Sequence, residues 1–555
     1  MMERLPQNYT PLNYDFYMHI TENQYPFDAS VTITFQKNED SDKLYLNVDP
    51  EIQIKKITQN KIDLTYTVDY PMLIIERSKD PDMDFITYPI TIEYNVSPTE
   101  DDNEGFFVCN GNYLTDFEPT GARKLLPCFD EPCVRSTFSV KLLTPSYLTS
   151  ISNMPIESIN TKEIENEITF VKSPPMCTYL LCLCIGSFSS IVGSTDSGTM
   201  VEYFTSTGRE NYLYRYLDVA IYALNWLESK FGVKYELPHL QLISLYGFPG
   251  GMENYGLITL NDYTRSSNFL YNKTVIMHEI THQWFGDLVC IKYWDSLWLN
   301  EGFAEFIQYL ILRDYDSKLN ASELFSLNDG LCCLNYFDYG VITPPESDVN
   351  FDTLFDSLVY SKGAFVLKMF FDMVGEESFV KVCSNYLNKF KNKCVEVNDF
   401  IDVANSTLNN DFTSFFNPWL RDVGFPVLNI NEIEKDSQKV GITITQINQN
   451  DRLFKFKVPI IYEKNCEIKK IEVNIDDYFM QVDIEFDWVI VNDEMASLCY
   501  VIYSKNLMES LKKPKTERKI SKLNKILINK SIDSHAVQFL IDEEMEQLLG
   551  EFNRS

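Results

Sequence analysis

Hydrophobic and polar residues alternate along many short stretches in the first third of the chain. Residues 28–35 and 89–94 have this two-residue period, which is typical of strands with one buried face. Similar runs recur up to about residue 188, separated by Asn, Asp and Pro residues that favour turns. The pattern predicts an N-terminal all-β domain over residues 1–188.

From about residue 189 we expect the apolar spacing to become helical. Residues 210–231 follow a helical period. A strand is expected at 240–246, and helices are expected from residue 273 to about residue 420. This order predicts a mixed α/β domain over residues 189–425.

Strand patterns return after residue 426. Three runs carry them: residues 440–445, 453–458 and 471–475. They predict a small β-sandwich over residues 426–503. Residues 504–555 follow as a helical tail whose basic start we interpret as a solvated helix face. The whole chain is therefore expected to be a multidomain α+β protein.

Length and charge narrow the class of protein. The 555 residues allow three or four domains, and an apolar fraction of 45% describes a globular chain with large cores. The net charge of −32 argues against a nucleic-acid or anionic-membrane partner. The same charge fits either simple solubility or an acidic cleft that attracts cationic groups, and composition does not separate the two.

The sequence indicates a cytoplasmic protein. The first residues contain no apolar segment typical of a signal peptide. The longest apolar run, near residues 176–185, is too short to span a bilayer and better fits a buried strand. The 13 cysteines are odd in number and form no Cys-x-x-Cys pair, so we expect reduced thiols, most of them structural.

One predicted helix, over residues 273–288, carries a metal-ligand pattern. His278 and His282 stand four positions apart, so both imidazoles lie on one helix face, where one metal ion can join them. Glu279 follows the first histidine, which completes the His-Glu-x-x-His pattern of zinc hydrolases. The alternative is an ordinary buried helix with two histidines, but the chain has only five histidines in all.

A second predicted helix, over residues 294–304, supplies the expected third ligand. Catalytic zinc usually takes three protein ligands and a water. Glu301 lies 19 positions after His282, which leaves room for a loop and a returning helix. No third histidine stands at the short spacing that metzincins use. We therefore predict one zinc ion held by His278, His282 and Glu301, with Glu279 as the general base.

Four segments together resemble the zinc aminopeptidases related to aminopeptidase N, most closely the puromycin-sensitive aminopeptidase type. They are Phe117-Glu-Pro-Thr-Gly-Ala-Arg with Pro127-Cys-Phe-Asp-Glu-Pro; Gly250-Gly-Met-Glu-Asn; His278-Glu-Ile-Thr-His with Trp298-Leu-Asn-Glu-Gly-Phe-Ala; and Tyr360-Ser-Lys-Gly-Ala. They stand in the family's order and at its spacing. The resemblance implies a thermolysin-like catalytic domain and peptide substrates with a free N-terminus.

The resemblance also implies roles that the residues alone do not assign. Tyr360 would donate a hydrogen bond to the oxyanion, although by itself it could be any surface tyrosine. Glu253 and Glu118 would bind the substrate α-amine. The remaining residues of the glycine-rich motif would line the peptide: Gly250, Gly251, Met252 and Asn254. Without the resemblance that motif indicates only a turn, and residues 115–132 only an exposed connecting loop.

The chain departs from the family at several points. Asp116 replaces a frequent glutamine and adds negative charge near the amine site, which would favour basic N-terminal residues. Gln308 replaces a glutamate that supports a zinc histidine, and Asp287 replaces an asparagine. The family's long C-terminal helical domain is expected to be missing beyond its first helices. That absence predicts an open cleft and self-association through the C-terminal segment.

The expected function is a zinc metallo-aminopeptidase that releases single residues from peptide N-termini. Two alternatives remain. One is an epoxide hydrolase with aminopeptidase activity, like leukotriene A4 hydrolase, which carries the same Gly-Gly-Met-Glu-Asn motif. The other is a catalytically impaired peptide-binding or scaffold protein, suggested by Gln308 and the short C-terminus. Intact Glu279 and Tyr360 argue against the impaired protein.

Overall fold

The computed structural model describes most of the chain and divides it into two compact units. The described residues are 4–21, 24–78, 85, 88–100, 102–262, 269–335, 341–435, 438–447 and 452–511. The first unit comprises Met1–Trp294 with Leu387–Val395, and the second comprises Asp295–Tyr386 with Glu396–Ser555.

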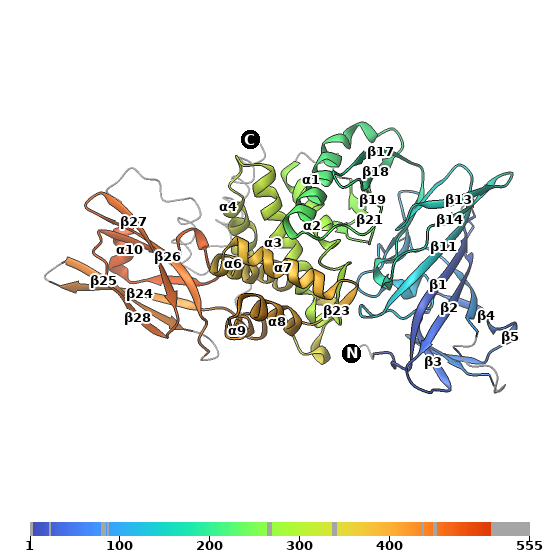
Figure 1. Ribbon diagram of the computed structural model, residues 1–555, viewed down its shortest axis with the longest axis horizontal. Coiled ribbons are helices and arrows are strands. Elements are labelled where there is room, and N and C mark those ends of the chain that lie inside the picture. The colour runs from blue at the N-terminus through green and yellow to red at the C-terminus, as the bar shows by residue number, and fades with distance from the viewer. Residues whose placement is uncertain are drawn as a thin grey trace. The chain divides into compact units, whose positions relative to one another are not determined.

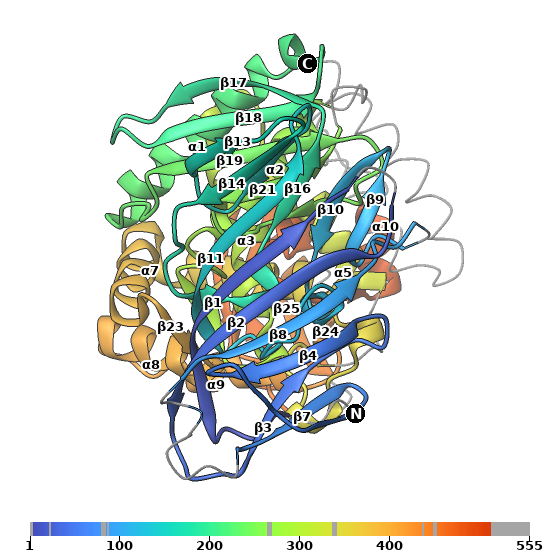
Figure 2. The same ribbon diagram turned by 90° about the vertical axis from the view of Figure 1, so that its right-hand side faces the viewer.

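A nine-stranded sheet dominates the first unit (Figure 2). Its central strands are β1 (Tyr9–His19), β2 (Phe27–Lys37), β8 (Ile90–Val96) and β11 (Arg135–Pro145). Strand β1 runs antiparallel to β2 and parallel to β11. Every second residue of β2 is buried, which confirms the strand expected from the alternating pattern at residues 28–35.

Shorter strands complete the β-rich part of this unit. The large sheet also holds β4 (Gln53–Gln59), β5 (Ile62–Asp63), β13 (Ile156–Thr161), β14 (Glu165–Phe170) and β15 (Met176–Cys177). A second sheet contains β9 (Gly105–Cys109), β10 (Asn112–Asp116), β12 (Thr149–Ser152) and β16 (Leu183–Gly186). A third contains β3 (Lys43–Asn47), β6 (Tyr66–Asp69) and β7 (Met72–Glu76). The apolar run at 176–185 thus forms two buried strands with a turn between them.

A mixed five-stranded sheet follows in the same unit. It contains β17 (Phe188–Ser194), β18 (Met200–Ser206), β19 (His239–Leu245), β20 (Gly251–Met252) and β21 (Leu257–Asn261). Helix α1 (Tyr214–Phe231) lies beside these strands (Figure 1) and ends at Gly232, which has φ +66°. The expected switch to helices at residue 189 was wrong. The strands β17 and β18 come first, and β18 pairs in parallel with β19 within the sheet.

The helix with the two histidines is α2 (Phe269–His282), and it ends six residues earlier than expected. Beyond His282 the chain turns, and the Asp287 amide donates to the His282 carbonyl at 3.0 Å. Gly286 has φ +139°, which a helix does not tolerate. The short strand β22 (Val289–Ile291) follows and pairs in parallel with β23 (Lys393–Val395).

The second unit combines a helical part with a β-sandwich. Its helices are α3 (Trp298–Tyr315), α4 (Ala321–Phe325), α5 (Leu331–Asn335), α6 (Gly363–Val374), most of α7 (Glu376–Phe390), α8 (Val397–Leu408), α9 (Thr413–Arg421) and α10 (Lys505–Leu511). Aromatic side chains fill its core, and Phe370 packs edge-on against Phe400 and Phe412.

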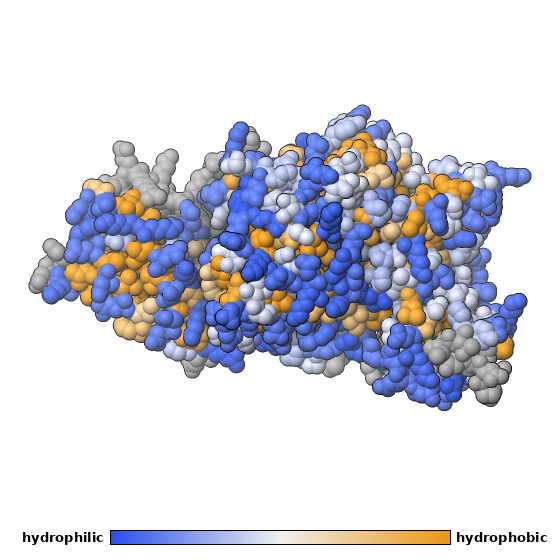
Figure 3. Space-filling model, viewed as in Figure 1, coloured by the Kyte–Doolittle hydropathy of each residue, from blue (hydrophilic) through white to orange (hydrophobic). Residues whose placement is uncertain are grey.

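The predicted β-sandwich is confirmed. One sheet contains β24 (Val427–Lys435), β25 (Gln438–Ile447), β28 (Phe479–Val482) and β30 (Tyr500–Tyr503). The other contains β26 (Phe456–Lys464), β27 (Glu467–Ile475) and β29 (Trp488–Val491). Hydrophobic residues gather over these strands on the face seen in Figure 3. The expected helical tail is described only as far as α10, and residues 512–555 lie outside the described residues.

Two further expectations concern membranes and cysteines. Among the described residues, no helix has both the length and the apolar composition needed to cross a membrane. Each of the 13 cysteines lies in the described part of the chain and is a free thiol.

Candidate metal centre

Helix α2 brings two imidazoles together in the interior of the first unit. His278 and His282 are 8% and 1% exposed, and their Nε2 atoms lie 3.0 Å apart. Two nitrogens on one tetrahedral zinc, at about 2.0–2.1 Å each, would be about 3.4 Å apart. The His282 Nδ1 lies 3.0 Å from the Phe285 carbonyl and donates to it, which leaves the lone pair on Nε2. The two imidazoles therefore fit a metal ion bound between them.

Glu279 lies against a glycine of the neighbouring strand β20. A Cβ atom added at Gly251 would stand only 2.6 Å from the Glu279 Cδ atom. The Glu279 side chain therefore occupies the space that a side chain at position 251 would need. Gly250 has φ +66°, a backbone conformation that favours glycine, whereas Gly251 is required by the contact with Glu279.

Further carboxylates surround this helix face. The ligand atoms of Glu253, Glu279 and His282 all lie within 4.8 Å of one another, and all three residues are buried. Glu118, from the loop after β10, has a carboxylate oxygen within the same distance of Glu253. The first unit thus gathers a His/Glu cluster that could hold a metal ion, with two carboxylates side by side next to it.

The side chain of Gln283, the residue after α2, joins the glycine-rich motif to the end of this helix. Gln283 accepts hydrogen bonds from the Tyr235 hydroxyl and the Gly256 amide, both at 3.1 Å, and donates to the Glu253 carbonyl at 2.8 Å. Asn254 is fully buried and donates to Thr259 at 3.3 Å. Sequence reasoning missed Gln283. Its only sequence signal is its place directly after His282.

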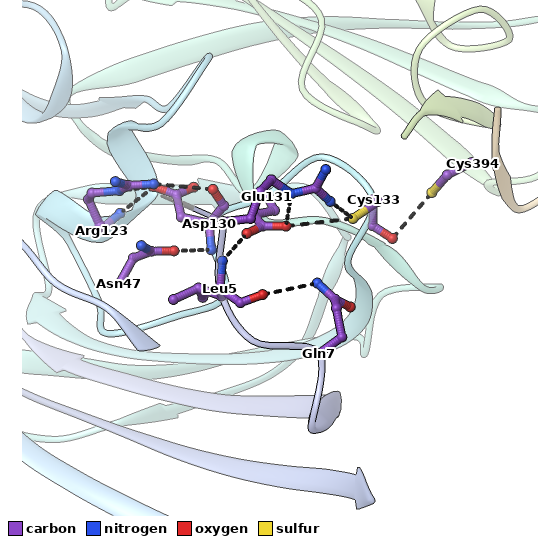
Figure 4. A network of polar contacts seen from close by, with 9 residues as sticks. Leu5, Gln7, Asn47, Arg123, Asp130, Glu131, Cys133 and Cys394 are labelled. Carbon is purple, nitrogen blue, oxygen red and sulfur yellow. Dashed lines mark hydrogen bonds and ion pairs between the residues drawn. The ribbon is translucent and has the colours of Figure 1, made fainter. Parts of the chain in front are cut away.

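Residues 115–132 are not an exposed loop. Most of them are buried, and the Arg123 guanidinium pairs with Asp130 at 2.7 Å. The Asp130 amide donates to the Asn47 side chain at 3.1 Å, and the Phe129 amide donates to Tyr14 at 3.0 Å. These turn-forming residues are therefore fixed by side chains from distant strands, which a local pattern does not reveal (Figure 4).

Two aspartates near the cluster have raised pKa values. Burial, reinforced by the charges of Glu253 and Glu104, raises the pKa of Asp116 to about 7. Burial and the Glu253 charge also raise the pKa of Asp287 well above its usual range. A pKa of about 7 leaves Asp116 only partly ionised at neutral pH.

The remaining predicted residues lie in the second unit. Glu301 stands in the first turn of α3 and is 1% exposed. Tyr360 stands in a π-helical turn, Leu358–Lys362, that leads into α6, and the neighbouring Ser361 hydroxyl donates to Asp329 at 2.8 Å. Such turns often mark functional positions. Gln308 donates to the Glu305 carboxylate, so it has its own partner on α3.

Two family descriptions match the chain. The Peptidase M1 N-terminal domain matches residues 10–180, and the Peptidase family M1 domain matches residues 215–419. The second match contains both histidines, Glu279, Glu301 and Tyr360. The chain belongs to peptidase family M1.

Three curated relatives are each similar to this chain over part of their own length. Alanine/arginine aminopeptidase of Saccharomyces cerevisiae is 31% identical over 480 residues, which is 80% of this chain and 54% of the relative. Probable aminopeptidase 1 of Sulfurisphaera tokodaii is 30% identical over 498 residues, 87% of this chain and 62% of the relative. Glutamyl aminopeptidase of Rattus norvegicus is 28% identical over 477 residues, which is 79% of this chain and 49% of the relative. The chain therefore spans about half the length of the curated relatives it matches.

Proposed function

We propose that this M1 chain is a zinc metallo-aminopeptidase that hydrolyses the N-terminal residue from peptides. One observation carries the proposal: the convergent Nε2 atoms of His278 and His282 lie next to Glu279 and the paired carboxylates. The two histidines and Glu301 would hold the zinc. When bound, zinc supplies a Lewis acid that polarises the scissile carbonyl and lowers the pKa of water.

The residues of the chain divide the remaining work. The Glu279 carboxylate accepts the proton of the attacking water and returns it to the leaving amine. The Tyr360 hydroxyl donates a hydrogen bond to the oxyanion. Glu253 and Glu118 pair with the substrate ammonium, which fixes the scissile bond one residue from the N-terminus. The comparisons favour neither the epoxide hydrolase nor the impaired scaffold.

The location and partners of the protein belong to the same proposal. Thirteen free thiols are typical of a reducing compartment, so we place the protein in the cytoplasm. Its partners are peptides with a free N-terminus. Turnover of a panel of aminoacyl fluorogenic amides, with zinc content measured on the same sample, tests the function. Stoichiometric zinc without turnover of any amide would contradict it.

Substrate binding should depend on the paired carboxylates. Glu253→Ala is expected to raise KM strongly, because the substrate ammonium loses one of its two counter-charges. N-acetylated peptides should be poor substrates of the unaltered enzyme for the same reason. Steady-state kinetics on matched free and blocked peptides measure both effects. Equal cleavage of blocked and free peptides would show that the enzyme is not an aminopeptidase.

The oxyanion role of Tyr360 gives a different kinetic signature. Tyr360→Phe is expected to lower kcat by about 10²–10³-fold with little change in KM, as for a lost oxyanion donor. Tyr309→Phe is the matched control. It removes a tyrosine hydroxyl that has no role in the proposed mechanism and that accepts a hydrogen bond from Asn328 at 3.2 Å. A Tyr360→Phe enzyme with a normal kcat would remove this tyrosine from the mechanism.

Asp116 predicts a pH dependence of substrate binding. Its pKa of about 7 means that it is neutral below this pH and negative above it. KM for a dipeptide should therefore fall as pH rises from 6 to 7.5, and most for a basic N-terminal residue. Asp116→Asn should flatten this part of the profile, since it removes the titrating group. An unchanged profile in the variant would assign the dependence to another group.

A further inference from the structure

Two strand pairs of the first unit bring three thiols and an arginine together. Cys290 of β22 and Cys394 of β23 are directly paired in the parallel ladder. Arg135 of β11 and Cys177 of β15 are directly paired in an antiparallel ladder. We call Cys177, Cys290, Cys394 and Arg135 the thiol cluster.

Arg135 joins the two ladders. Its guanidinium donates to the Cys290 Sγ atom and, at 2.8 Å, to the Asp287 carbonyl. It also donates to the Pro175 carbonyl and to the Asn392 side chain. In the part of the chain that the structure describes, no carboxylate oxygen lies within 4.0 Å of a nitrogen of Arg135. Cys290 is therefore the nearest group that can balance this positive charge.

The pKa values of Cys290 and Cys177 are shifted in opposite directions. Burial alone raises the pKa of the Cys290 thiol, but contacts with Cys177, Cys394 and Arg135 outweigh it and hold this pKa well below its usual value. Burial raises the pKa of Cys177 well above its usual value. The direction of these shifts favours the thiolate form on Cys290 rather than on Cys177.

Cys394 lies at the rim of the cluster. It is half-buried, whereas Cys177 and Cys290 are fully buried. Its Sγ atom donates to the Cys133 carbonyl at 3.3 Å, and Figure 4 shows it pointing toward that oxygen. The Cys177 Sγ atom donates to the adjacent Pro132 carbonyl at 2.7 Å. Both sulfurs therefore contact one short segment next to Arg135.

The ladder also gives the geometry that a disulfide requires. Residues directly opposite in neighbouring strands lie about 4.8 Å apart, and their side chains leave the same face of the sheet. Disulfides join Cα atoms that are about 4.4–6.8 Å apart. The register of Cys290 and Cys394 therefore places their Cα atoms within the range in which a disulfide forms.

We propose that Cys290, beside Arg135, and Cys394 form an oxidation site at which hydrogen peroxide closes a disulfide between β22 and β23. The Cys290 thiolate attacks one peroxide oxygen and breaks the O–O bond, which gives a sulfenic acid and, with one proton, water. The Cys394 sulfur then attacks the Cys290 sulfur and displaces hydroxide, which takes the Cys394 proton and leaves as a second water. Two thiols are oxidised and one peroxide is reduced.

Oxidation should reach the metal centre through the turn after α2. Arg135 donates a hydrogen bond to the Asp287 carbonyl, and the Asp287 amide donates to the His282 carbonyl. The His282 ring in turn donates to the Phe285 carbonyl. Closing the disulfide moves the Cys290 sulfur, which shares one Arg135 nitrogen with the Asp287 carbonyl, so we expect the hydrogen bonds of this turn to change. Weakening a hydrogen bond behind a metal ligand typically costs about 10-fold in metal affinity or more. This consequence rests on the proposed function, but the disulfide itself does not.

The test is disulfide mapping by mass spectrometry. The intact protein is treated with increasing hydrogen peroxide, and the remaining thiols are alkylated. We expect linked peptides of Cys290 and Cys394 at the lowest doses. Cys182 and Cys184 are the internal control: their sulfurs are 3.9 Å apart and buried, with burial as the main cause of the raised pKa of Cys184. That pair should stay reduced.

Variants make the result specific. Arg135→Gln should slow the linkage and Arg135→Lys should largely preserve its rate, because lysine keeps the charge. Cys394→Ser should keep its activity before oxidation. After peroxide it should leave a sulfenic acid on Cys290 for dimedone to trap, or a Cys290–Cys177 link. This variant changes the half-buried member, so the test does not depend on the folding of a Cys290 variant.

Three outcomes would overturn the proposal. Cys290 and Cys394 could both remain alkylatable at doses that oxidise the exposed Cys466. The control pair could link as fast as the thiol cluster does. The thiols could instead resist peroxide because they hold a stoichiometric zinc of their own. Disulfide formation without faster loss of the active-site zinc to a chelator would leave the oxidation site standing and contradict only its link to the metal centre.

Discussion

Glu279→Gln is expected to keep one zinc per chain and to lower kcat by about 10²–10⁴-fold, the usual contribution of a general base. Glutamine has nearly the same shape, so it fits the narrow space beside Gly251. It cannot accept the proton of the attacking water. Zinc content by elemental analysis and kcat on one fluorogenic amide measure the two effects on the same preparation.

A companion variant separates the chemistry of Glu279 from its position. Gly251→Ala keeps the Glu279 carboxylate but adds a methyl group 2.6 Å from the Glu279 Cδ atom, so the Glu279 side chain must move. A large fall in kcat is expected here too. Glu167→Gln on β14, whose carboxylate pairs with Lys162 at 3.2 Å, is the control and should keep its activity. A Glu279→Gln enzyme with a near-normal kcat would mean that another group takes the proton.

The parts of the site that sequence predicted are those fixed by local spacing. The four-residue separation of His278 and His282 requires a helix to place both rings on one face, and α2 confirms this. The end of that helix was predicted wrongly. Residues 283–288 have helical spacing, but Gly286 and the bond from Asp287 to His282 turn the chain.

Other features depend on pairings between distant residues and leave no local signal. Gln283 looks like one more helix residue, yet it joins Tyr235, Gly256 and Glu253. The thiol cluster exists because two ladders pair distant residues, Cys290 with Cys394 and Arg135 with Cys177. Nothing in the spacing of the 13 cysteines indicates this. Strand register, rather than residue type, is what the sequence leaves open here.

His282→Ala is expected to abolish both stoichiometric zinc and activity. The variant removes one of the two convergent nitrogens and leaves the Phe285 carbonyl without the imidazole that donates to it. Because His282 is almost fully buried, part of any loss could come from instability. Activity alone therefore does not decide the result, and the variant needs a measurement that reports zinc binding by the folded protein.

Thermal unfolding with and without zinc supplies that measurement. A ligand that binds only the folded state raises Tm, so zinc should raise the Tm of the unaltered protein and of the control His239→Gln. His239 is the right control because it is a buried histidine outside the site, 3.3 Å from Glu202. His282→Ala should unfold cooperatively, with a Tm that zinc does not change. A His282→Ala protein that retained one tightly held zinc would show that the metal binds elsewhere, and the assignment of His278 and Glu301 would be wrong with it.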